Sequence, residues 1–163
     1  MLAKLQAQKK DLAGAHASYE AAIKVDPSYP PPYLPLAQAA AQAHQWQDAL
    51  SLTDRLLGLD ASRYPLAYYY NAVANYNLDR LSAAEESALK AEGLDKAHLE
   101  PRIEILLAMI YTAKQNYSAA AEHYGTYLRI VPDGPLTAQV KSDLAKCEEM
   151  AKVKSAQEGS SKP

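Results

Sequence analysis

Histidine and cysteine are the side chains most often used for catalysis and for metal binding, and this sequence contains few of them. The four histidines are widely separated along the chain: His16, His44, His98 and His123. No paired-cysteine, HExxH or nucleophile-elbow pattern occurs, and there is no glycine-rich phosphate-binding loop. Glu122 and His123 are neighbours on a predicted helix, so they point in different directions and cannot chelate one ion together. The sequence therefore predicts no catalytic site, no metal site and no cofactor, which means a protein that is not an enzyme.

Two of these residues have simple structural interpretations. Cys147 lies on the apolar stripe of a predicted helix, which favours a small core hydrophobe over a reactive thiol. Because it is the single cysteine, it cannot form an internal disulfide. His123 is predicted to be a surface residue of an outer helical layer.

The composition is that of a soluble globular protein, with 48% hydrophobic and 22% charged residues. The net charge is −2, and acidic and basic residues are mixed, so the chain has no basic patch for nucleic acid. No apolar stretch reaches the ~20 residues of a membrane span. Met1–Lys10 lacks the apolar core of a signal peptide. We therefore expect a cytoplasmic location by default, and a periplasmic or secreted one if a signal peptide precedes this sequence.

A repeating pattern runs along the chain. Four alanines follow one another at spacings of 34, 35 and 36 residues: Ala15, Ala49, Ala84 and Ala120. The segment Leu66–Asp95 contains two helical patterns joined by a tight turn, and it sets the register for the other repeats. A period of this length built from two helices predicts a stack of helix pairs.

The repeats resemble those of the tetratricopeptide repeat family over about residues 1–132. That family has a large aromatic residue early in the first helix, a small residue one turn later, and a closing proline. The matching residues are Tyr33, Tyr68, Ala37, Ala72, Ala108, Pro27 and Pro132. Glu104 departs from the aromatic position, and Ala61 and Lys96 depart from the proline position. The resemblance implies an all-α fold, a right-handed superhelical solenoid of antiparallel helix pairs.

Four helix pairs are expected, at roughly 1–27, 30–61, 65–96 and 99–132. In the first pair, Met1–Gln8 supplies only the latter half of a first helix, which favours a fragment whose natural N-terminal portion has been removed; a naturally short first helix is the alternative. Residues 135–152 are predicted to form a C-terminal capping helix, because one narrow apolar stripe is surrounded by charged faces. Residues 155–163 are predicted to be a disordered tail.

The resemblance implies that the first helices of the repeats line a concave groove, while the second helices form the outer layer. Helical spacing then gives the groove residues. They are Leu34, Gln38, Leu66, Tyr69, Val73, Tyr76, Asn77, Arg102, Ile105, Met109 and Thr112. Several of these are apolar although their helices already have a separate apolar stripe for packing. Such a second apolar face either meets a ligand or packs inside the protein.

The sequence thus predicts a non-enzymatic scaffold that binds a protein or peptide partner in this groove. The alternative is a module for self-assembly or for docking within a larger multidomain protein. A clamp for a C-terminal carboxylate, as one branch of the family has, is not expected. Gln38, Val73 and Met109 stand where that clamp needs charged groups, and Arg102 is the one strong cation placed nearby.

Asn71 and Asn75 lie at positions where the family has apolar residues. A buried amide must find hydrogen-bond partners, so we predict a satisfied polar pair that fixes helix register. Contact with a bound peptide backbone is the alternative for both. For Asn77, which is nearer the groove, the two interpretations have equal support.

Overall fold

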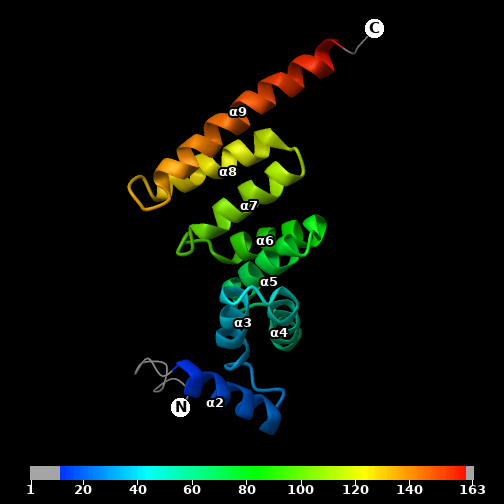
Figure 1. Ribbon diagram of the computed structural model, residues 1–163, viewed down its shortest axis with the longest axis vertical. Helices are drawn as coiled ribbons and strands as arrows, with labels where there is room; N and C mark the ends of the chain where they lie inside the picture. The colour runs from blue at the N-terminus through cyan, green and yellow to red at the C-terminus, as the bar shows by residue number, and fades with distance from the viewer. Residues whose placement is uncertain (1–11, 161–163) are drawn as a thin grey trace.

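The computed structural model describes residues 12–160 of the chain. Within this range there are eight α-helices and no strand. The helices are α2 (Leu12–Val25), α3 (Tyr33–Gln42), α4 (Trp46–Leu59), α5 (Pro65–Asn77), α6 (Leu81–Leu94), α7 (Arg102–Ala113), α8 (Tyr117–Ile130) and α9 (Thr137–Ser160). Figure 1 shows them stacked along one long axis, with α2 at one end and α9 at the other. The expectation of a half-helix at Met1–Gln8 lies outside the described residues.

The same turn joins the two helices in three successive pairs, α3–α4, α5–α6 and α7–α8. In each turn one residue that is not glycine adopts a left-handed backbone: His44 (φ 58°), Asp79 (φ 58°) and Gln115 (φ 57°). In the middle pair the Asp79 amide donates to the Tyr76 carbonyl, and the Arg80 amide donates to the Asn75 carbonyl at 2.9 Å. These two bonds satisfy the last carbonyls of α5 in the Schellman arrangement. Because such a turn is short, the paired helices are antiparallel neighbours.

Small residues allow the helices to approach one another closely. The alanines of the repeat pattern are fully buried in the second helices (Ala49, Ala84, Ala120) and in the first helices (Ala37, Ala72, Ala108). The small positions predicted from the sequence are thus confirmed. A side chain larger than alanine at these positions would push neighbouring backbones apart.

The core is a series of apolar clusters, and each combines residues from neighbouring pairs. One cluster joins Ala72 of α5 and Ala88 of α6 to Leu107 and Ile110 of α7. Another joins Ala108 of α7 to residues of α8 and α9. No single pair buries its own apolar surface completely, so the stability of each pair depends on the next one in the stack.

A buried polar network crosses from α4 through α5 to α6. The Asn71 side-chain amide donates to Thr53 Oγ1 at 3.0 Å and to Asp54 Oδ1 at 2.7 Å. Its carbonyl oxygen accepts from Asn75 Nδ2 at 2.9 Å and from Ser87 Oγ at 2.8 Å. The prediction that Asn71 and Asn75 form a satisfied polar pair is therefore confirmed, and the network holds three helices in register.

The last helix, α9, packs along α8 at the end of the stack (Figure 1). Val140 and Cys147 of its apolar stripe are buried, as predicted for Cys147, whereas Leu136 is exposed. The helix continues to Ser160, so the prediction of a disordered tail from Ser155 is wrong for residues 155–160. Strong helix formers fill the last turns, and Lys154 Nζ donates to the Gln115 carbonyl at 3.0 Å. No helix in the described part of the chain, α9 included, is both long and apolar enough to cross a membrane.

Candidate functional site

Three of the predicted groove residues border one hollow near the C-terminal end of the stack. The hollow has a volume of about 310 Å³ and is lined by Tyr76, Met109, Thr112, Ala113, Tyr124, Asp143, Lys146 and Cys147. Met109 is 38% exposed, although the rest of the apolar surface of α7 is largely buried. Thr112 Oγ1 donates to the Ala108 carbonyl at 2.8 Å and lies 3.4 Å from Cys147 Sγ. The hollow therefore has an apolar floor and a few polar groups.

The side of the hollow formed by α9 was missed by the sequence prediction. Asp143 and Lys146 of α9 form an ion pair with a separation of 3.1 Å. Cys147 lies on the apolar stripe of α9, which was predicted to face the stack. Residues one helical turn from Cys147 were therefore the available signal for this side of the hollow. Which of them reach the hollow depends on the angle at which α9 crosses α8. That angle is a tertiary property that helical periodicity does not encode.

Tyr69 and Arg102 form a second contact between α5 and α7. The guanidinium carbon of Arg102 lies 5.1 Å from the centre of the Tyr69 ring, within the range of a cation–π interaction. Arg102 is also paired with Glu100, with 2.5 Å between Nε and Oε1. Burial raises the pKa of Tyr69 above its ordinary value, so the ring stays neutral at physiological pH.

The remaining predicted groove residues are divided among different environments. Leu34 and Leu66 are half-buried against one apolar cluster. Val73 packs against a second cluster and Ile105 against a third. Gln38 is exposed and lines a separate hollow beside α2, with His16 and Tyr19. The exposed Asn77 amide donates to the Val73 carbonyl of its own helix at 2.8 Å.

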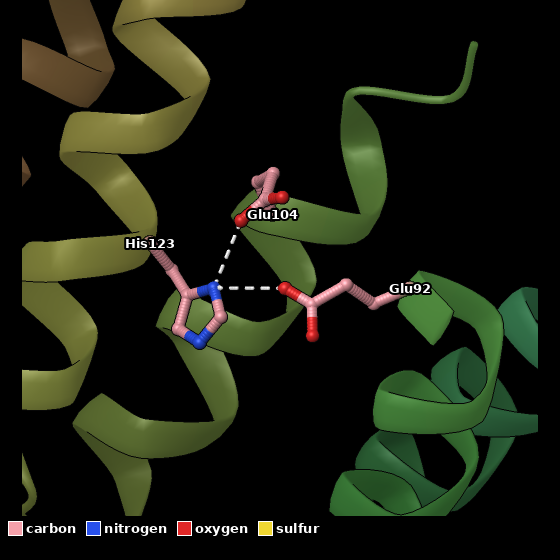
Figure 2. A group of neighbouring side chains, drawn as sticks. All are labelled: Glu92, Glu104 and His123. Carbon is pink, nitrogen blue, oxygen red and sulfur yellow. Dashed lines mark hydrogen bonds and ion pairs between the residues drawn. The ribbon is translucent and has the colours of Figure 1, made fainter. Parts of the chain in front are cut away.

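A charged cluster lies where α6, α7 and α8 meet (Figure 2). His123 Nδ1 of α8 lies 2.8 Å from Glu104 Oε2 of α7 and 3.7 Å from Glu92 Oε1 of α6. The side chain of Glu104 is only 3% exposed, compared with 18% for His123 and 33% for Glu92. His98, in the loop after α6, places its Nδ1 3.7 Å from the other Glu104 oxygen. The prediction that His123 is a surface residue is therefore wrong.

The neighbours of the cluster hold these side chains in place. The rings of His123 and Tyr111 are stacked, with centroids 5.4 Å apart and planes inclined by 15°. Burial raises the pKa of Glu92 above its ordinary value, and the neighbouring Glu104 carboxylate raises it further. The two carboxylates thus repel each other across the same imidazole.

The sequence contained one signal for this cluster, the departure of Glu104 from the aromatic position of the repeat. A charged residue at a position that is normally buried needs a partner. Glu92, Glu104 and His123 come from three helices, so neither spacing nor helical periodicity identifies them as neighbours. The sequence prediction of no metal-ligating group rested on short motifs, which cannot detect such a cluster.

Comparison with known proteins identifies the architecture. No protein-family model matches the sequence, and no curated protein matches it. A crystal structure of MamA aligns with a TM-score of 0.73 at 20% identity over 96% of this chain and 98% of its own. The Arabidopsis OM64 TPR domain aligns with a TM-score of 0.63 at 20% identity. The alignment covers 70% of this chain and 92% of that domain. TTC0263, a thermophilic TPR protein in Thermus thermophilus, aligns with a TM-score of 0.65 at 20% identity. The alignment covers 90% of this chain and 77% of TTC0263.

The chain has the tetratricopeptide-repeat fold. The expected all-α solenoid of helix pairs is thereby confirmed. Within this fold, Glu104 stands in the fourth repeat where Tyr33 and Tyr68 stand in the preceding two. In the same register, Glu92 corresponds to Leu57 and His123 to Ser87. The charged cluster is therefore specific to one junction of the solenoid and is not a property of the repeat.

Proposed function

We propose that this chain is a non-enzymatic scaffold that binds a short segment of a partner protein in a groove along α5, α7 and α9. The observation that carries the proposal is the exposure of Met109 inside the hollow shared with Tyr76 and Thr112. Tyrosine offers a large apolar ring with a polar tip, and methionine adapts its shape to different partners. The tetratricopeptide-repeat fold supports a role in protein–protein interaction in general.

The partner segment should be close to neutral and should carry one bulky apolar side chain. A hollow of about 310 Å³ accommodates such a side chain and its neighbours. The charged groups at its edge, Asp143 and Lys146, already neutralise each other. The absence of a cation at Gln38, Val73 and Met109 argues against a terminal carboxylate as the recognised group.

A few such contacts are enough for a transient interaction. Truncation of a buried anchor residue costs ~1–3 kcal/mol of binding energy, so two or three anchors give micromolar affinity. Tyr69, with Arg102 stacked on its ring, supplies a further apolar surface beyond the hollow. We expect Tyr69, Tyr76 and Met109 to be the anchors.

Selection from a random peptide library displayed on phage tests this function without knowledge of the natural partner. The selected peptides are then synthesised and measured against the native chain, Met109→Ala and Met150→Ala. Met150 is the matched control, because it is a methionine of similar exposure, 44%, on α9 and outside the hollow.

We expect the selected peptides to share an apolar residue and to bind Met109→Ala at least ~10-fold more weakly, which corresponds to about 1.4 kcal/mol. Binding to Met150→Ala should not change. Peptides that bind all three proteins equally, or a selection that yields no binding peptide, would contradict the groove assignment.

A second candidate function, self-assembly, is supported by apolar surface at the other end of the stack. Val25 is 87% exposed and, with Tyr29, borders a hollow of about 860 Å³ between α2 and α3. Three consecutive prolines, 30–32, also line this hollow. Because this surface has few charges, a second copy of the chain is the occupant we propose.

Sedimentation velocity over a wide range of concentration tests self-assembly. The native chain should associate as concentration rises, and Val25→Glu should not. Leu99→Glu is the matched control, since Leu99 is a similarly exposed aliphatic residue far from this hollow. A native chain that stays monomeric throughout would exclude this function.

A further inference from the structure

We propose that Glu92, Glu104 and His123 form a binding site for a divalent transition metal ion of the zinc class, and that His98 lies beside this site. Imidazole nitrogen and carboxylate oxygen are typical zinc ligands, and three protein ligands are the usual number in an accessible zinc site. The site lies outside the peptide groove and goes beyond the scaffold function.

The distances between donor atoms fit a single ion. His123 Nδ1 lies 2.8 Å from Glu104 Oε2 and 3.7 Å from Glu92 Oε1, and all three donor atoms fall within 4.8 Å of one another. Two ligands of a tetrahedral zinc ion are about 3.3–3.5 Å apart, given bonds of ~2.0–2.2 Å. The observed separations bracket that value, so small side-chain rotations suffice to enclose an ion. Figure 2 shows both carboxylates directed at the same nitrogen.

At this cluster two carboxylates face one nitrogen, and only one of them is within hydrogen-bonding distance of it. His123 Nδ1 carries at most one proton, which can serve only one carboxylate, and its short contact is with Glu104. Glu92 then faces the same nitrogen at 3.7 Å, beyond hydrogen-bonding distance, and beside a second carboxylate. Two carboxylates thus face one imidazole nitrogen, an arrangement that suits a divalent cation. An ion in place of the proton would therefore satisfy all three side chains at once.

The fourth side chain, His98, is held near the site by its loop. The Asp95 carboxylate accepts hydrogen bonds from the amides of Leu99 and Glu100, at 2.9 and 2.8 Å. The His98 amide donates to the Asp95 carbonyl, and His98 itself adopts a left-handed backbone with φ 50°. This loop keeps His98 Nδ1 3.7 Å from the buried Glu104 carboxylate. The half-exposed ring of His98 and the partly exposed Glu92 leave a path for the ion from solvent.

The ligand set distinguishes zinc-class ions from the hard cations. Ca²⁺ binds 6–8 oxygen ligands, and Mg²⁺ requires octahedral oxygen coordination that includes several waters. Here one of the three grouped side chains, His123, presents an imidazole nitrogen, which these cations bind weakly. Because its ligands come from α6, α7 and α8, the ion would link the third and fourth repeats and make the junction between them more rigid.

Isothermal titration of zinc chloride into the chelator-treated full chain tests the site, together with thermal unfolding followed by circular dichroism. We expect one zinc ion per chain and a melting temperature raised by about 5 °C or more at zinc 100-fold above Kd. Glu92→Gln is the test variant, because this side chain is the most exposed of the three, at 33%, and the substitution keeps its shape.

Glu92→Gln should weaken zinc binding at least ~10-fold, and His16→Ala should not change it. His16 is the matched control, since it also pairs with a glutamate, Glu20, at 3.8 Å, but on the surface of one helix. Cobalt(II) should give the visible absorption of a tetrahedral site in the native chain and not in Glu92→Gln. The inference is overturned if zinc does not bind, or if Glu92→Gln binds it as tightly as the native chain. It is also overturned if His16→Ala weakens binding as much as Glu92→Gln.

Discussion

The third and fourth repeats both bury polar side chains, but they satisfy them in different ways. In the third repeat, Asn71 donates two hydrogen bonds and accepts two, so donors and acceptors are balanced. Where the fourth repeat meets the third, Glu104 and Glu92 present acceptors to a single imidazole nitrogen. The first cluster is neutral at its centre and complete. In the second, Glu104 lies within hydrogen-bonding distance of the nitrogen and Glu92 lies 3.7 Å away.

Both clusters can be compared by aligning equivalent positions of the third and fourth repeats. Ser87 in the third repeat and His123 in the fourth are equivalent, yet Ser87 bonds to Asn71 while His123 bonds to Glu104. Leu107 stands in the fourth repeat where Asn71 stands in the third, so the polar centre has moved from one helical position to another. The Asn71 network holds helices in register, whereas we propose that the charged cluster takes up a metal ion.

The largest effect is expected from Asn71→Leu. The substitution removes four side-chain hydrogen bonds at once, those to Thr53, Asp54, Asn75 and Ser87. The free energy of unfolding, measured with urea, should fall by about 2–3 kcal/mol, whether or not zinc is present. Ser82→Ala, an exposed change on α6, is the control and should have almost no effect. A loss below about 0.5 kcal/mol would show that the network is not structural.

A smaller change in stability is expected from Glu104→Gln. The glutamine keeps the shape and a hydrogen bond to His123 while removing the charge that repels Glu92. Without metal, the free energy of unfolding should stay within about 1 kcal/mol of the native value. Zinc should no longer raise the melting temperature. If this variant loses as much stability as Asn71→Leu, the two clusters do not differ in the way described.

The smallest effect is expected at the turns, where the two repeats are alike. Asp79 and Gln115 have the same left-handed backbone, with φ of 58° and 57°. Glycine relieves strain there but gains entropy in the unfolded chain, so the changes nearly cancel. Asp79→Gly and Gln115→Gly should each alter the free energy of unfolding by less than about 1 kcal/mol, and by similar amounts. A large difference between them would mean that the repeats differ in more than their polar clusters.

The sequence predicted those features that every repeat requires. Alanines such as Ala84 and Ala120 recur because stacked helices need a small residue at each junction, so their spacing gives the fold. Asn71 and Asn75 were predicted as a satisfied pair because a buried amide has few alternatives. The end of α9 was predicted less well, since Ser155–Ser160 contains no strong helix breaker before Gly159.

The sites were harder to predict because they depend on several helices meeting. Periodicity assigns Met109 to a face of α7, but it does not place Lys146 of α9 beside it. Glu92, Glu104 and His123 are brought together only by the stacking of three helices. The carboxylate of Glu104, at a position that is aromatic in the preceding two repeats, indicates that a polar partner is needed there. It does not indicate which residues those partners are.

Anomalous diffraction at the zinc absorption edge, from crystals of the chain grown with zinc chloride, tests the central comparison most directly. We predict one strong peak at the junction of α6, α7 and α8, about 2.0–2.2 Å from Glu92, Glu104 and His123 Nδ1. No peak should occur at the Asn71 network. The account is contradicted if the junction has no peak while zinc is bound at surface residues such as His16.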